Sequence, residues 1–104
     1  MIGKLEEVVL LATIRAGAGS LPSGIYEHIV ATVPEGEKEP AFGAVYTTIM
    51  RMAAKGMLSE GSKTDEKGRP RKSFTVTADG TRALQAGLSQ TAALGGYQLK
   101  GALA

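Results

Sequence analysis

Four of the twelve lysines and arginines of the chain lie in one short stretch, "KGRPRKSFTVT", at residues 67–77. These clustered cations are Lys67, Arg69, Arg71 and Lys72. Gly68 can adopt a positive φ and Pro70 holds φ at roughly −65°, so a tight turn accounts for both of them. A turn does not account for the charge, which suits a phosphate or a carboxylate ligand. The cluster therefore predicts an anion-binding turn, unless it only keeps an exposed loop in solution.

Helices and a hairpin must position this turn. Apolar periodicity, prolines and glycines predict four helices, two strands and a connecting loop of roughly ten residues. The predicted helices span residues 3–16, 22–33, 41–55 and 78–92, and the predicted strands are "MLSEGS" (57–62) and "KSFTVT" (72–77). Thr77 suits the N-cap of the last helix, and Gly95 with Gly96 is expected to end it. The predicted fold is mostly α with a small β-hairpin (α+β), in the order α-α-α-β-β-α.

The third predicted helix has an apolar side and a small, hydroxylated, positive side. At about 100° per residue, the apolar side holds Phe42, Val45, Ile49, Met52 and Ala53. The opposite side holds Ala44, Thr47, Thr48, Arg51 and Lys55. A solvated helix face usually mixes Glu with Lys, and this face has no acid. Small side chains allow close approach to DNA, and Arg51 can pair bidentately with a guanine.

Three helices with an outward-facing third, followed by a hairpin with a basic tip, form a winged helix-turn-helix. In this arrangement the third helix enters the major groove, and the wing reaches the backbone or the minor groove. Residues 1–77 would then form the DNA-binding domain, and residues 78–104 a dimerisation helix and tail in the same compact unit. The alternative is a winged-helix interaction module whose basic wing docks an acidic partner. Steep salt dependence and sequence preference would favour DNA.

The composition limits the function classes. The chain has 104 residues, of which 43% are hydrophobic and 21% charged, which is typical of one globular domain. A net charge of +2 is mild, so a DNA partner is inferred from the placement of the cations. The absence of cysteine excludes disulfides and thiolate chemistry. The apolar run near the amino terminus is too short to span a bilayer and is preceded by acids, so we expect a cytoplasmic protein without a membrane partner.

No combination of residues predicts catalysis, a metal or a cofactor. His28 is the only histidine, and a lone imidazole makes neither a metal site nor a triad. The stretch "GAGSLPSG" lacks the lysine and the preceding strand of a phosphate-binding loop. Glu35, Glu37 and Glu39 are expected to be solvated surface. We therefore expect a protein that is not an enzyme.

Three stretches resemble the PadR-like family of winged-helix transcriptional regulators. "KLEEVVLLATI" is similar to its first helix, "GAVYTTIMRMAAKGML" to its third, and "KGRPRKSFTVTADGTRAL" to its wing and last helix. The resemblance covers about residues 3–90 and implies DNA contact by the Gly43–Lys55 helix and the wing. The expected DNA contacts are Gly43, Ala44, Tyr46, Thr47, Thr48, Arg51, Lys55, Lys67, Arg69, Arg71 and Lys72. The chain departs from the family at Ala41, where a capping Ser is common, and in its acidic turn before the third helix.

The resemblance also implies a dimer formed through the last helix. Leu84, Leu88 and Ala92 lie on one stripe of that helix, and the nearly all-apolar first helix offers a matching surface. A two-fold dimer predicts a palindromic operator with half-sites about one DNA turn (~34 Å), or a multiple of it, apart. Any small-molecule effector would bind at the dimer interface, and the regulator is expected to be a repressor.

Overall fold

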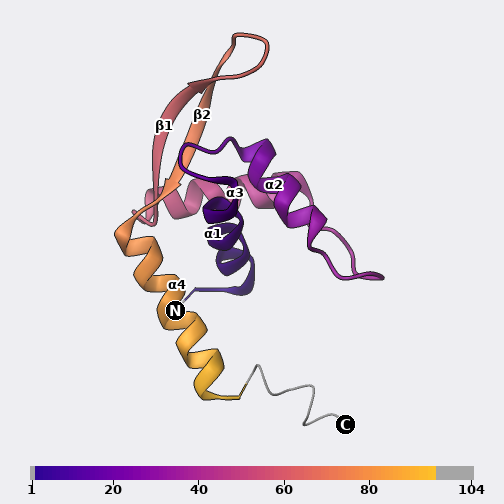
Figure 1. Cartoon of the computed structure of the whole chain (residues 1–104), viewed down its shortest axis with the longest axis vertical. Coiled ribbons are helices and arrows are strands. Elements are labelled where there is room, and N and C mark those ends of the chain that lie inside the picture. Colours follow the sequence, from indigo (N-terminus) through magenta and orange to yellow (C-terminus); the bar gives the residue numbers. More distant parts are fainter. Residues whose placement is uncertain (1, 96–104) are drawn as a thin grey trace.

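The computed structural model describes residues 2–95 and contains four helices and an antiparallel hairpin (Figure 1). The helices are α1 (Lys4–Ala16), α2 (Pro22–Ala31), α3 (Phe42–Ala54) and α4 (Ala78–Ala93), and the strands are β1 (Leu58–Thr64) and β2 (Pro70–Val76). The predicted order α-α-α-β-β-α is confirmed. Gly96 and the closing "YQLKGALA" segment lie outside the described residues. None of the helices within residues 2–95 has the length and apolar character needed to cross a bilayer.

Helix α1 lies at the centre of the fold and contacts the three other helices and β2. Its Val9 and Leu10 are fully buried, together with Ile25 of α2, Val45 of α3 and Phe74 of β2. Pro22 begins α2 within the first turn, where its missing N–H breaks no helical bond. Apolar side chains from all four helices and both strands pack into one core, to which the outer half of α4 does not contribute. This core fixes the positions of α3 and the hairpin.

The hairpin is anchored at its base and exposed at its tip. Ser20 and Phe74 exchange backbone hydrogen bonds, from Ser20 N to Phe74 O at 2.9 Å and from Phe74 N to Ser20 O at 2.8 Å. Beyond this bridge the hairpin projects past the helices (Figure 1). Its strands pair from Leu58 opposite Val76 to Thr64 opposite Pro70, leaving residues 65–69 as the loop. The predicted loop of roughly ten residues was wrong, because the strands continue through polar residues solvated on both faces.

A tight joint connects the hairpin to α4. Thr77 is the N-cap, as predicted: its Oγ1 accepts from Gly80 N at 3.0 Å and donates to Gly56 O at 2.6 Å. Gly80 packs directly against the backbone, since a Cβ added there would lie 2.2 Å from the carbonyl oxygen of Met57. The outer part of α4 then extends away from the other helices (Figure 1). The joint therefore holds α4 to the end of α3 and the base of the hairpin.

Candidate nucleic-acid interface

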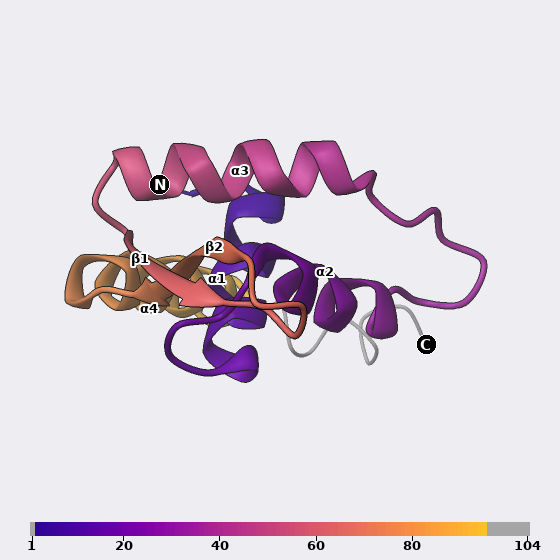
Figure 2. The same ribbon diagram turned by 90° about the horizontal axis from the view of Figure 1, so that it is seen from above.

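Helix α3 lies along one side of the molecule, where Figure 2 shows it as a separate layer. Its inward side is formed by Val45, Thr48, Ile49 and Met52. The other residues predicted to contact DNA on this helix are exposed: Gly43, Ala44, Tyr46, Thr47, Arg51 and Lys55. Gly43 and Ala44 leave the amino-terminal half of this face flat, so a partner can approach the backbone closely there. The exposed face is therefore small-chained and positive.

Two residues of α3 were assigned to the wrong side. Thr48 was predicted to face DNA, but it is only 3% exposed and its hydroxyl donates to Ala44 O at 2.8 Å. That bond satisfies the hydroxyl, so the short side chain can be buried without an unpaired polar group. Phe42 was predicted to face the core, but it is 43% exposed because it lies at the first turn, beyond the end of the buried stripe.

An aromatic cluster fixes the start of α3 instead of a capping side chain. Ala41 offers no side-chain cap. Tyr26 of α2 packs edge-on against Phe42, with ring centroids 5.2 Å apart, and its hydroxyl donates to Pro40 O at 2.9 Å. The Tyr46 ring lies 6.1 Å from that of Phe42 and is 37% exposed. These contacts tie the beginning of α3 to α2 and leave Tyr46 at the surface.

The exposed face of α3 has no acidic residue of its own, but the fold places one from α1 beside it. Glu6 of α1 lies beside α3, where its Oε2 accepts from Lys55 Nζ at 3.1 Å. Hydrogen bonds from the Gly3 amide and then from Lys55 lower the pKa of Glu6, as does the nearby charge of Arg51. Lys55 is therefore partly neutralised. Arg51 forms no ion pair with any residue of the part of the chain that the structure describes. The sequence did not indicate the contact of Glu6 with Lys55, because the two residues are 49 positions apart.

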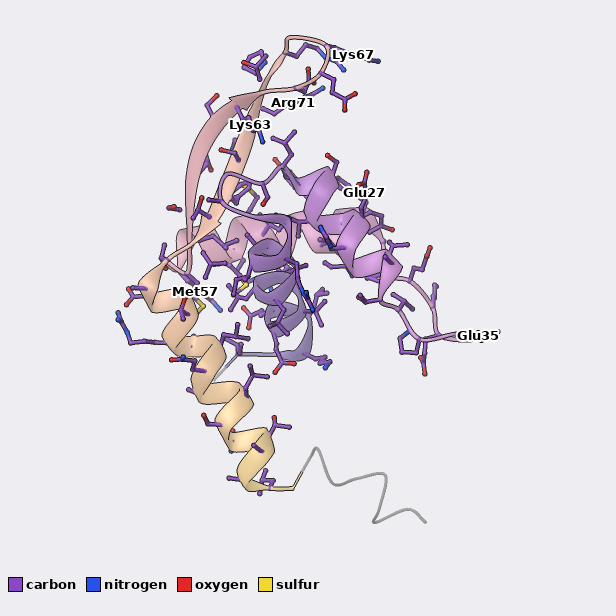
Figure 3. The ribbon with its side chains drawn as sticks, in the orientation of Figure 1. Glu27, Glu35, Met57, Lys63, Lys67 and Arg71 are labelled. Carbon is purple, nitrogen blue, oxygen red and sulfur yellow. The ribbon has the colours of Figure 1, made fainter. Side chains whose placement is uncertain are left out.

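The wing gathers its predicted cations but also contains acids. Lys67, Arg69, Arg71 and Lys72 are all exposed, and Figure 3 shows Lys67 and Arg71 near the tip with Lys63. Lys63 on β1 lies opposite Arg71 on β2, a fifth cation that sequence reasoning missed because it assigned this residue to a loop. Asp65 forms ion pairs with Arg69 and Arg71. Glu60 Oε1 lies 3.9 Å from Lys72 Nζ. Lys63 and Lys67 form no ion pair within residues 2–95.

An open groove of about 520 Å³ separates the wing from the beginnings of α2 and α3. Phe42 and Tyr46 form its helical side, and Pro70, Arg71 and Lys72 form its wing side. A second groove, of about 610 Å³, lies between the start of α1 and the exposed face of α3, with Thr47 and Arg51 on its border. The α3 face therefore has a groove along each side, and each groove contains a cation.

The predicted dimerisation residues are not equivalent. Leu84 is only 4% exposed because it packs into the core of its own chain, so its assignment to a dimer interface was wrong. Leu88 is 42% exposed and Ala92 is also exposed, on the part of α4 that extends away from the body. On α1, Leu11 and Ile14 are 40% and 49% exposed. These four residues leave apolar surface for a partner.

The acidic turn before α3 lies apart from the wing. Glu35, Glu37 and Glu39 are exposed, and Figure 3 shows Glu35 at the far end of the α2–α3 loop, away from Lys67 and Arg71.

Among residues 2–95, no group of histidines and carboxylates has the arrangement needed to hold a metal ion.

The comparisons with known proteins agree with this geometry. The model of the transcriptional regulator PadR-like family matches residues 25–86. A PadR family transcription regulator from Clostridium difficile is 16% identical, with a TM-score of 0.72 over 94% of this chain and 97% of that chain. A PadR-like transcription factor from Bacteroides fragilis is 20% identical, with a TM-score of 0.67 over 96% of this chain and 89% of that chain. No curated protein matches the chain.

Proposed function

Because the chain belongs to the PadR-like family of transcriptional regulators, we propose that it is a sequence-specific regulator that binds duplex DNA and represses transcription. Helix α3 enters the major groove, and the wing contacts the backbone or the minor groove. The proposed function requires no catalysis. It assigns DNA contacts to Gly43, Ala44, Tyr46, Thr47 and Arg51 of α3, to its C-cap Lys55, and to Lys67, Arg69, Arg71 and Lys72 of the wing.

The observation that carries this proposal is the exposed face of α3. Arg51 is exposed there, forms no ion pair within residues 2–95, and is flanked by the small side chains of Thr47 and Ala44. An arginine without an intramolecular partner retains its full capacity for bidentate hydrogen bonds. A flat helix face lets that guanidinium reach base edges, where sequence is read.

The wing supports the proposal through charge. Three of its cations, Arg69, Arg71 and Lys72, contact carboxylates through ion pairs at the surface. Such pairs contribute little in water, and each cation keeps further N–H donors for phosphate. The groove between the wing and α3 is bordered by Arg71 and Lys72 on one side and by the aromatic rings of Phe42 and Tyr46 on the other. A phosphodiester strand fits this combination, because the cations suit its phosphates and the rings suit its sugars.

We propose a two-fold dimer formed by α4 against α1 of a second copy. The exposed apolar residues Leu88 and Ala92 of α4 and Leu11 and Ile14 of α1 support this arrangement. A two-fold axis would pair two α3 helices with a palindromic operator. Any small-molecule effector would bind at this interface.

A second candidate function is an interaction module that docks an acidic protein. The exposed rings of Phe42 and Tyr46 favour it, because aromatic side chains are common anchors of protein interfaces. Such a module would bind duplex DNA neither with sequence preference nor with steep salt dependence. These two properties therefore separate the candidates.

The test is selection of fragments from a random duplex pool by the purified protein, followed by binding measurements on the enriched site and on random DNA. We expect enrichment of a palindromic site. Arg51→Ala should weaken binding to that site by about 1–3 kcal/mol and to random DNA far less. Equal losses on both duplexes would show that Arg51 contacts only phosphate. A pool without enrichment would contradict sequence-specific binding.

A further inference from the structure

Asp65 is a carboxylate in the middle of the basic wing. Its Oδ1 accepts hydrogen bonds from the backbone amides of Lys67 and Arg69, both at 2.9 Å. Its Oδ2 accepts from Arg71 Nε at 3.0 Å and lies 3.5 Å from Arg69 Nε. One side chain thus binds both the backbone of the loop and its two arginines.

The surrounding groups keep Asp65 ionised. Hydrogen bonds from the Arg69 amide and then from Arg71 lower the pKa of Asp65. Its side chain is 16% exposed, whereas those of Arg69 and Arg71 are 57% and 48% exposed. A negative charge inside a surface proposed to contact phosphate should by itself weaken binding. Its position therefore requires an explanation other than charge.

The atoms involved supply that explanation. Both arginines approach Asp65 through Nε, the nitrogen closest to the chain. A guanidinium has five N–H donors in a fixed plane, so the four donors on the two terminal nitrogens remain for another acceptor. A carboxylate hydrogen-bonded at Nε, as Asp65 is to Arg71, restricts the plane of a guanidinium and leaves its outer edge for another acceptor. A flexible arginine would lose that rotational freedom only on binding.

We propose that Asp65 is a positioning residue for DNA binding: it holds Arg69 and Arg71 with their terminal nitrogens directed toward phosphate. This inference rests on the proposed function and extends it to a residue that opposes DNA electrostatically. Its consequence is a sign opposite to the one that charge alone predicts. Removal of the Asp65 charge makes the wing more positive and nevertheless weakens its binding to duplex DNA.

The test compares Asp65→Asn with Glu66→Gln in binding to one duplex at fixed salt. Asparagine retains an Oδ1 acceptor for the two loop amides but presents an amide donor to Arg71, so the loop is kept and the arginine is released. Glu66 is the next residue, is exposed and forms no ion pair within the described residues, so its variant changes the charge alone. We expect Asp65→Asn to weaken binding about three- to tenfold, and Glu66→Gln to leave it equal or tighten it by up to about twofold. If Asp65→Asn binds as tightly as Glu66→Gln, the inference is wrong.

A further measurement separates positioning from a loss of structure. In an Arg71→Gln background, Asp65→Asn should have about half of its effect or less, because the arginine that hydrogen-bonds to Asp65 is absent and only Arg69, at 3.5 Å, remains. An undiminished effect there, or a loss of binding matched by lower thermal stability, would instead indicate that Asp65 only holds the loop, and would overturn the inference. A wild type without salt-dependent DNA binding would overturn the proposed function as well. A wild type that binds while Asp65→Asn binds equally well overturns the inference alone.

Discussion

The joint between the hairpin and α4 allows a sharp test with one methyl group. Gly80→Ala places a Cβ 2.2 Å from the carbonyl oxygen of Met57 and 3.0 Å from Cγ1 of Val76. The first neighbour is backbone, so no rotamer change relieves the contact. Helix α4 must move by about 1 Å, which disturbs the bonds of Thr77 to Gly80 N and Gly56 O.

The expected loss follows from three effects. Overpacking against a rigid group costs about 1–3 kcal/mol, and a weakened N-cap costs about 1 kcal/mol. The higher helix propensity of alanine returns at most about 1 kcal/mol. The free energy of unfolding should therefore fall by about 2 kcal/mol, which corresponds to a decrease in melting temperature of about 10 °C for a chain of this size.

Gly87→Ala is the matched control in the same helix. Its Cβ would lie 3.6 Å from Cγ1 of Ile2, an ordinary contact, so the variant should be more stable by about 0.5–1 kcal/mol. Thermal unfolding at one fixed protein concentration measures both variants. Shifts of the same sign and size would refute the argument that Gly80 is required by the approach of Met57.

Three further predictions concern charge and assembly. Replacement of Arg69 and Arg71 by Gln should reduce the slope of log affinity against log salt by about two units per wing, and an unchanged slope would mean that neither arginine contacts phosphate. Leu88→Asp places a charge on the exposed apolar side of α4 and should convert a dimer into a monomer in sedimentation, whereas a monomeric wild type would contradict the dimer. Hydrogen bonds from the Gly3 amide and then from Lys55 lower the pKa of Glu6 below its ordinary value of 4.5. The Glu6 carboxylate therefore stabilises the fold fully at pH values above about 4.5. This contribution is lost as pH falls through the lowered pKa, so the stability difference between wild type and Glu6→Gln should shrink in acid; a constant difference would contradict this.

Local signals in the sequence predicted the elements and their order. Pro22 at the start of α2 and Gly56, at φ 81° after α3, are both boundaries set by backbone chemistry within one turn. Thr77 is likewise a local cap. The strand ends were predicted less well, because the outer hairpin is solvated on both faces and its polar residues carry no alternation.

The candidate site was predicted less completely, because its composition depends on packing between distant segments. A helical wheel gives the order of residues around α3, but not which arc faces inward. Thr48 was therefore predicted on the outer side and Phe42 on the inner side, opposite to where they lie. The burial of Leu84 within its own chain could not be distinguished from burial in a dimer, since both require an apolar stripe. Glu6 reaches Lys55 only after α1 and α3 have packed together.

The bridge between Ser20 and Phe74 divides the hairpin into two dynamic regimes. Phe74 is fully buried and its amide is bonded inside the core, so that amide should exchange with solvent only when the whole domain unfolds. Near the tip, the hydrogen bonds of the loop are surrounded by solvent, and their amides should exchange through local opening that leaves the core intact. Because the base is bonded into the core, we expect the hairpin to bend without detaching. On timescales shorter than unfolding, its tip should then move along an arc about a fixed base, a smaller volume than a free loop would sample.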